Sequence, residues 1–187
     1  MLQMNIAVSS KEDLITECKK IVKQQGIKGV SIRSLAKEAG ISTGAVYNYF
    51  PSKNQLLAET IGSIWGEIFH FSSSNLTFTS FSQCLQALFD SIEAGKQLYP
   101  HFFTEHALVM SMENEKMGKK LMASYWDHIK ESMLLTLRSD QQVRQGVFGP
   151  DLTPEEFVEY CFELFLSVMV SEKRSESLLK FVENALY

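Results

Sequence analysis

The sequence is poor in the residues that break helices or cross-link small folds. Only four prolines and ten glycines occur in 187 residues, and the three cysteines, Cys18, Cys84 and Cys161, lie far apart with no CxxC or Cys/His spacing. Widely separated cysteines of odd number are typical of reduced thiols and not of a disulfide framework. We therefore exclude disordered and disulfide-rich classes, and we expect no metal site.

The sequence also lacks an apolar run that could cross a membrane. No stretch reaches the ~18 apolar residues that a spanning helix needs. The first residues, MLQMNIAVSS, have no basic region followed by a long apolar one, as a secretory signal would. We expect a cytoplasmic protein with no membrane partner.

Charge is unevenly distributed along the chain. The net charge is −4, but residues 1–60 carry eight Lys/Arg against five Asp/Glu, whereas residues 61–187 carry ten against seventeen. A polyanion would be attracted to the first third of the chain and repelled by the rest. This division is compatible with a nucleic-acid partner for the first third.

What the sequence does contain is apolar residues recurring three and four apart, without hairpin dipeptides between alternating runs. This spacing predicts an all-α fold. Three helix starts carry a capping residue followed three positions later by an acid or amide. They are Ser10 with Asp13, Ser52 with Gln55, and Thr153 with Glu156. The expected helices cover about 10–25, 31–39, 43–50, 52–71, 81–95, 98–112, 115–138, 153–170 and 175–187.

Residues 31–50 have the pattern of a helix-turn-helix. Two short helices that cross steeply need a small residue at the crossing and a residue tolerant of positive φ in the turn. Ala36 and Gly40 meet these needs, and Val46 returns into a core with Leu35 and Ile41. An ordinary amphipathic hairpin is the alternative.

The outer face of the second helix favours a DNA reader over that alternative. It carries aromatic rings without an evident place in the core and small polar groups that suit base edges or phosphates. These residues are Thr43, Ala45, Tyr47, Asn48 and Tyr49. A short helix of this kind fits a major groove about 12 Å wide.

The segment GISTGAVYNYFPSKNQLL resembles the N-terminal domain of the TetR family of repressors, and the resemblance covers about residues 10–60. It implies an N-terminal helix-turn-helix DNA-binding domain at 1–53 and a C-terminal helical domain for ligand binding and dimerisation at 54–187. The DNA-binding residues that it implies are Ser31, Arg33, Thr43, Gly44, Ala45, Tyr47, Asn48, Tyr49 and Lys53.

Some of these residues have a role that their chemistry supports. An arginine such as Arg33 can bind guanine through two hydrogen bonds. Lys53 matches a phosphate contact, although a first-turn lysine can also be merely solvated. Tyr47 could instead pack under the first helix. Tyr49 replaces the family's frequent histidine, and a phenol does not titrate near neutral pH.

The stretch EEFVEYCFELFLSVMV is apolar nearly all round, so its helix is expected to be buried on several sides. The resemblance implies that this helix and the last one form a four-helix bundle in a homodimer, which would present two readers to a palindromic site. One large monomeric core is the alternative. The predicted interface residues are Phe157, Cys161, Phe165, Met169, Leu178, Phe181 and Val182.

The middle helices are unusually rich in aromatic residues and methionine, which suit a pocket for a small hydrophobic ligand. Each of these residues could equally be part of an ordinary core. The predicted pocket residues are Trp65, Phe69, Phe89, Phe103, His106, Met110, Met122 and Trp126.

The sequence favours a homodimeric repressor that a small hydrophobic ligand releases from double-stranded DNA. An activator is also compatible with these features. A helical enzyme or carrier for a hydrophobic molecule is the alternative, but the sequence has no GxGxxG, GxxxxGK[ST], GxSxG or HExxH motif. We therefore expect no enzyme activity and no cofactor. A third reading is a protein-docking adaptor.

Overall fold

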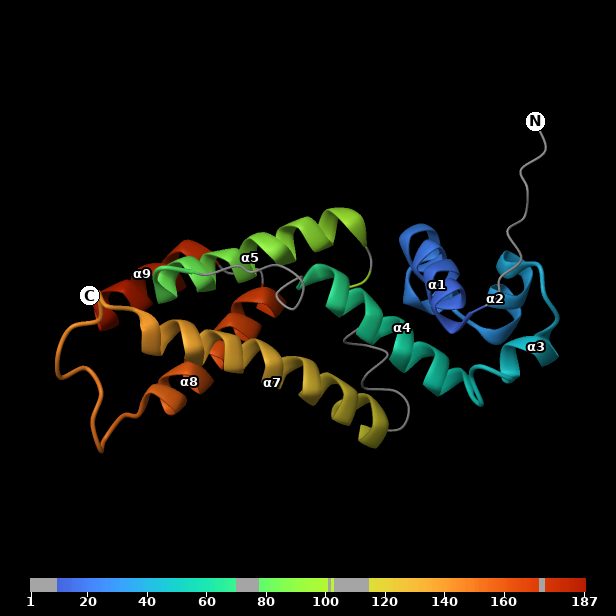
Figure 1. Cartoon of the computed structure of the whole chain (residues 1–187). Coiled ribbons are helices and arrows are strands. Elements are labelled where there is room, and N and C mark those ends of the chain that lie inside the picture. The colour runs from blue at the N-terminus through green and yellow to red at the C-terminus, as the bar shows by residue number, and fades with distance from the viewer. Residues whose placement is uncertain (1–9, 70–77, 101, 103–114, 172–173) are drawn as a thin grey trace. The chain divides into compact units, whose positions relative to one another are not determined.

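The computed structural model describes residues 10–69, 78–100, 102, 115–171 and 174–187, and these residues form helices joined by loops (Figure 1). The all-α prediction is confirmed. Apart from one isolated bridge between Gly149 and Leu152, the described residues contain no β-structure. The helices are α1 (Lys11–Gln25), a 3-10 turn η1 (Ile27–Gly29), α2 (Ile32–Ala39), α3 (Thr43–Tyr47), α4 (Lys53–Ile68), α5 (Phe81–Leu98), α7 (Glu115–Ser139), α8 (Pro154–Ser171) and α9 (Ser175–Leu186).

The chain forms two compact units. The first contains Met1–Glu67 with Gly95–Met122, and the second contains Ile68–Ala94 with Ala123–Tyr187. These units differ from the predicted functional domains, 1–53 and 54–187, because α4 belongs almost entirely to the first unit. Helices α5 and α7 each contribute residues to both units. The functional division at residue 53 stays a prediction.

The helices of the first unit begin where the sequence predicted them, but α3 ends at Tyr47 and not at residue 50. Ser10 caps α1 and closes a capping box with Asp13, and Gly26 ends the helix at φ 72°. Ser31 caps α2. Ser52 accepts a hydrogen bond from the Gln55 amide, but the Gln55 side chain donates to Glu59 instead of closing a box.

The crossing of α2 and α3 has the predicted geometry. Gly40 adopts the left-handed conformation at φ 67°, which only glycine adopts without strain. Ile41 donates its backbone N–H to the Ala36 carbonyl at 3.0 Å, so the chain reverses within three residues. Ala36 and Val46 are buried at the crossing and Leu35 completes the small core, whereas Ile41 is only half-buried.

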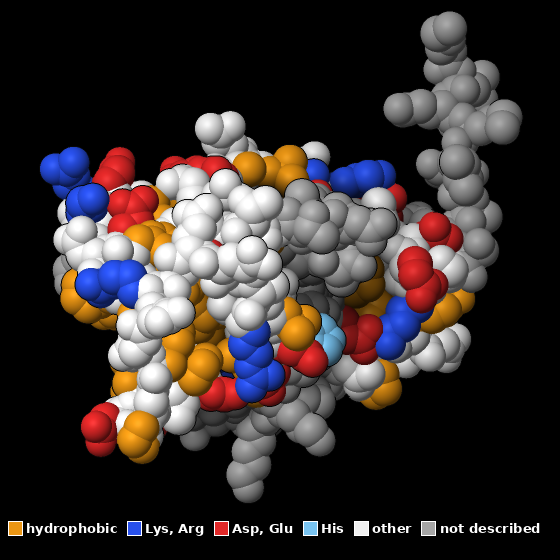
Figure 2. All heavy atoms as spheres, turned by 60° about the vertical axis from the view of Figure 1, so that its left-hand side comes forward, with side chains coloured by type: hydrophobic (Ala, Val, Ile, Leu, Met, Phe, Trp, Pro, Cys, Tyr) orange, Lys and Arg blue, Asp and Glu red, His pale blue; other side chains and the backbone are white. Residues whose placement is uncertain are grey.

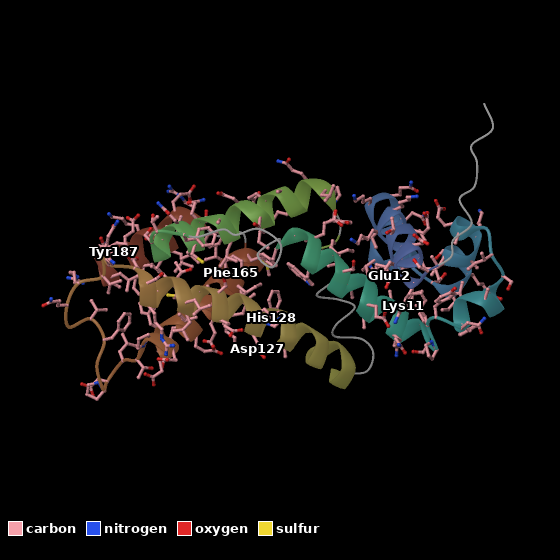
Figure 3. The ribbon with its side chains drawn as sticks, in the orientation of Figure 1. Lys11, Glu12, Asp127, His128, Phe165 and Tyr187 are labelled. Atoms are coloured by element: carbon pink, nitrogen blue, oxygen red, sulfur yellow. The ribbon has the colours of Figure 1, made fainter. Side chains whose placement is uncertain are left out.

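The second unit is built around aromatic rings. The Phe89 and Phe165 ring centres lie 5.0 Å apart, Phe162 and Phe165 are stacked at 6.0 Å, and Trp126 lies 5.5 Å from Phe162. Phe69 extends the row at 6.4 Å from Trp126. This continuous row joins Phe69, which follows α4 directly, to α5, α7 and α8 within the second unit, and Phe165 lies between the α5 and α7 ribbons (Figure 3).

Asp140 ties three segments of the second unit together. Its Oδ2 atom accepts hydrogen bonds from the Phe81 backbone N–H at 2.8 Å and from the Tyr187 hydroxyl at 2.6 Å, while Oδ1 accepts from the Gln142 N–H at 2.9 Å. Burial alone would raise the pKa of Asp140, but these hydrogen bonds lower it below its ordinary value. The carboxylate therefore caps α5 from a distant part of the chain.

The three cysteines are buried free thiols. Burial raises the pKa to about 11 for Cys18 and Cys84 and to about 12 for Cys161, so all three are neutral at physiological pH. No helix within the described ranges is long and apolar enough to span a membrane.

Candidate DNA-binding surface

Most of the predicted DNA-binding residues project from α2, α3 and the start of α4 into solvent. Tyr47 is 53% exposed although it is a large ring, so it does not pack under the first helix. Ala45 and Tyr49 are half-buried. Between Thr43 and Lys53, the buried residues are Val46 and Phe50. The exposed members of the predicted set are Arg33, Thr43, Gly44, Tyr47, Asn48 and Lys53.

Ser31, a member of the predicted DNA-binding set, also caps α2 at its predicted start. Its hydroxyl accepts the Ser34 backbone N–H at 3.0 Å, and the Ser34 hydroxyl accepts the Ser31 N–H at 2.8 Å. The Ser34 hydroxyl also donates to the Gly29 carbonyl at 2.7 Å. Two serines thus close a reciprocal cap on α2 and fix where Arg33 leaves the helix.

The cations of the first unit divide into two groups. Four of them are ion-paired on α1, namely Lys11, Lys19, Lys20 and Lys23. The other four cations of residues 10–69 make no ion pair within the described part of the chain, and all are exposed. They are Lys28, Arg33, Lys37 and Lys53. Arg33 and Lys37 lie one turn apart on α2 and so share a face.

Sequence reasoning missed Lys28 and Lys37 as candidate phosphate contacts. Both are exposed in η1 and α2, close in sequence to predicted DNA-binding residues. Their signal was the positive charge of residues 1–60, which the sequence analysis used only as a sum. Unpaired cations of this kind supply the sequence-independent part of DNA affinity.

Two ion pairs with the same sequence separation join α1 to α4. Lys11 Nζ lies 2.6 Å from a Glu59 carboxylate oxygen, and Lys19 Nζ lies 2.8 Å from Glu67 Oε2, with 48 residues between the partners in each case. Since both pairs advance by eight residues on each helix, the two helices run in the same direction along this contact. Lys11 lies beside the first half of α4 (Figure 3) and 5.4 Å from the centre of the Phe50 ring.

Glu67, at the end of α4, also binds the segment that follows α5. The Tyr99 hydroxyl donates to Glu67 Oε2 at 3.0 Å, and Lys23 Nζ lies 3.9 Å from Glu67 Oε1 and 5.0 Å from the centre of the Tyr99 ring. Burial would raise the pKa of Glu67, but hydrogen bonds from Lys19 and Tyr99 lower it. Burial, followed by this hydrogen bond, raises the pKa of Tyr99. We call Lys19, Lys23, Glu67 and Tyr99 the Glu67 cluster.

The predicted ligand-pocket residues separate into two groups. Phe69, Phe89 and Trp126 belong to the row of rings in the second unit. Trp65 belongs to the first unit, where it meets Phe102 edge-on at 5.4 Å. The backbone of Phe103, His106 and Met110 and the side chain of Met122 lie outside the described residues. A shared pocket stays a prediction.

Most of the predicted interface residues are buried within the single chain. Phe157, Cys161, Phe165, Leu178 and Val182 are buried in the isolated chain, and Met169 is half-buried. Phe181 is the exposed member, at 59%. The outer faces of α8 and α9 also expose two apolar residues that the prediction omitted, Tyr160 and Leu164. Apolar side chains reach the surface of the second unit among charged ones (Figure 2).

Comparison with known proteins agrees with the helix-turn-helix. Residues 19–60 match the family model described as bacterial regulatory proteins, tetR family. An uncharacterized HTH-type transcriptional regulator, YuxN of Bacillus subtilis, is 29% identical over 175 residues, which are 87% of this chain and 56% of that protein. The chain thus spans little more than half the length of this curated relative, and 59% of a second one.

Solved structures share the whole fold at low identity. The fatty acid degradation regulator FadR from Bacillus halodurans has a TM-score of 0.63 at 16% identity, covering 94% of this chain and 96% of that one. The multidrug binding protein EbrR complexed with proflavin has a TM-score of 0.62 at 13% identity, covering 92% and 97%. The first of the two curated relatives is named as a transcriptional regulator, and the second, 27% identical, is named as the nucleoid occlusion factor SlmA of Mannheimia succiniciproducens. Residues 19–60 thus match the tetR family of bacterial regulatory proteins, and the chain as a whole is similar in fold to TetR-family regulators.

Proposed function

We propose that this protein is a homodimeric transcription regulator that binds a palindromic DNA site through α3. The exposed face of α3 carries this proposal. Tyr47 and Asn48 face solvent although Val46 and Phe50 already complete the local core. Exposure of a large ring and an amide there contributes nothing to folding. Both are suited to base edges and phosphates in a major groove.

The neighbouring cations have separate roles in this proposal. Arg33 binds a guanine edge or a phosphate, and Lys53 binds a phosphate at the start of α4. Lys28 and Lys37 add further phosphate contacts. Because none of the four is neutralised within the described part of the chain, each is available to displace a counterion from DNA.

The second copy binds the exposed apolar face of α8 and α9. Tyr160, Leu164 and Phe181 are large apolar side chains in contact with water in the single chain. A twofold arrangement would bury both copies of each residue and present two α3 helices to DNA. Leu164→Glu and Phe181→Glu should convert the dimer to a monomer in sedimentation velocity, whereas Leu135→Glu on α7 should not.

A small hydrophobic ligand regulates DNA binding in this proposal, and the protein acts as a repressor. The aromatic row of the second unit offers flat apolar surfaces, and the structurally similar EbrR was solved with proflavin. A ligand that prefers one conformation lowers DNA affinity by the ratio of its affinities for the two conformations. Proflavin is a suitable first probe.

Selection from random-sequence duplexes, followed by anisotropy titration over a range of salt, tests the proposal. If every unpaired cation in both copies contacts a phosphate, the slope of log K against log salt approaches roughly −7. Lys53→Ala should weaken all duplexes alike and reduce that slope by about 2. Arg33→Ala should cost about 1–3 kcal/mol and relax the preference at one base pair.

Tyr47→Ala tests the reader itself, with Tyr47→Phe separating the ring from the hydroxyl and Lys180→Ala on α9 as an exposed control. If Tyr47→Ala and Lys53→Ala bind as the wild type does, the assignment of α3 is wrong. If the folded protein selects no sequence and its affinity is insensitive to salt, the DNA-binding function is wrong and a protein-docking role is favoured.

A further inference from the structure

Glu67 is the one described carboxylate of the first unit that joins three separate segments. It receives Lys19 and Lys23 from α1 and the Tyr99 hydroxyl from the segment after α5. Lys19 and Tyr99 approach the same oxygen, Oε2, which leaves Oε1 to face Lys23. The ring of Tyr99 is fully buried, so its hydroxyl has a fixed position from which to orient the carboxylate.

Stability alone is a weak reason for this arrangement. A partly exposed ion pair contributes little to stability, because water screens it and two long side chains must be ordered. Near the Glu67 cluster, the apolar residues Cys18, Ile64 and Trp65 are already fully buried. The Glu67 cluster instead sets the orientation of α1 relative to α4. A carboxylate that a buried phenol holds in place fixes the angle at which two successive turns of α1 meet α4.

Tyr99 connects the Glu67 carboxylate to the end of helix α5. Helix α5 begins in the second unit and ends in the first, and Tyr99 follows it directly. The Tyr99 N–H donates to the Gly95 carbonyl at 2.8 Å, so the last turn of α5 holds the Tyr99 backbone. From Tyr99 the contacts lead through Glu67 to α1, which packs on α2 of the reader.

We propose that Tyr99 and Glu67 are positioning residues for DNA recognition, which orient α1 on α4 and thereby the angle at which α2 and α3 are presented. This inference rests on the proposed DNA-binding function. It assigns the residues no contact with DNA. They affect how well the two α3 helices of a dimer match the spacing of the two DNA half-sites. They do not change the number of phosphate contacts.

The test uses Tyr99→Phe and Glu67→Gln in the full chain. Tyr99→Phe keeps the buried ring and removes one hydroxyl, and Glu67→Gln removes the charge. Glu12→Gln is the matched control, since Glu12 is exposed on α1 and makes no ion pair among the described residues. The control therefore reports the effect of removing one negative charge from α1.

Each variant is titrated with the selected duplex and with duplexes whose half-site spacing is changed by one base pair, a rotation of roughly 35°. The wild type should discriminate strongly between these duplexes. Tyr99→Phe and Glu67→Gln should lose about fivefold or more of that discrimination, with the salt slope unchanged, whereas Glu12→Gln should retain it.

An equal loss of affinity for every spacing, or a lower melting temperature with discrimination intact, would overturn the inference and leave the cluster a structural one. Wild-type protein that selects no DNA would refute the proposed function itself. The wild-type titration and the variant titrations therefore fail in distinguishable ways.

Discussion

The proposed DNA reader, which consists of α1, α2 and α3, is held together by different contacts from those of the second unit. In the reader, the helix ends are fixed by hydroxyl caps at Ser10, Ser31 and Ser42 and by ion pairs to α4. In the second unit, a row of buried rings joins helices that are far apart in sequence. Caps act within a few residues and leave the outer face of a helix free, so recognition residues can vary without loss of the fold. A ring core depends on a few large side chains.

The strongest test of this comparison is Phe165→Ala. Phe165 is fully buried and contacts two other rings, so its truncation should reduce the free energy of unfolding by about 3–5 kcal/mol. Urea denaturation followed by far-UV circular dichroism measures the change. Leu135→Ala, at a residue 63% exposed, should stay within about 0.5 kcal/mol. Equal effects of the two variants would refute the ring core.

Asp140→Ala tests how much one polar residue contributes to the stability of the second unit, for comparison with the helix caps of α1, α2 and α3. It leaves the Phe81 N–H and the Tyr187 hydroxyl without their acceptor. A buried unsatisfied donor costs about 1–3 kcal/mol. Denaturation at neutral pH measures the loss, and an effect near zero would mean that water replaces the carboxylate.

The same residue makes stability dependent on pH. Because the folded pKa of Asp140 is lowered, its contribution is present above the unfolded value of about 3.9 and is lost as pH falls through the folded pKa. Asp140→Asn should therefore be less stable than the wild type at pH 6, and the difference should shrink below pH 4. A difference that is constant from pH 6 to pH 3 would contradict this account.

The smallest effect is expected at Gly44, where a substitution should increase stability and not reduce it. A Cβ built there meets nothing closer than the Ser42 Oγ at 3.7 Å, so the fold does not require glycine. Gly44→Ala should stabilise the protein by about 0.5–1 kcal/mol because alanine is the better helix former.

DNA affinity should move in the opposite direction if a nucleic-acid backbone passes close to Gly44. Thermal denaturation and anisotropy titration measure the two effects. Gly29→Ala is the control, since a Cβ at Gly29 would lie 2.7 Å from the Gln25 Cβ and should destabilise. A Gly44→Ala variant that binds DNA as tightly as the wild type would remove this residue from the interface.

Local signals made the fold predictable. Ser10 with Asp13 and Thr153 with Glu156 form the predicted caps because each pair lies within one helical turn. Contacts across 32 to 59 residues, such as Tyr99 with Glu67 and Asp140 with Phe81, have no periodic signal. They could be found only once the chain was folded.

The site was predictable to the extent that exposure follows helical periodicity. Val46 is inside and Tyr47 is outside, as the spacing predicted. On α8 the same reasoning failed to separate inner from outer residues, because the helix is apolar on all sides. Phe165 is buried and Leu164 beside it is exposed, a difference that hydropathy alone does not encode.

The two ion pairs between α1 and α4 have a consequence for protein engineering. Both Lys11–Glu59 and Lys19–Glu67 span the whole of α2 and α3, yet neither uses a residue of those helices. The attachment of α1 to α4 therefore does not depend on which side chains α2 and α3 turn toward solvent. Exposed residues of α2 and α3 can be replaced in an engineered protein while both ion pairs and the buried contacts between α1 and α2 are kept.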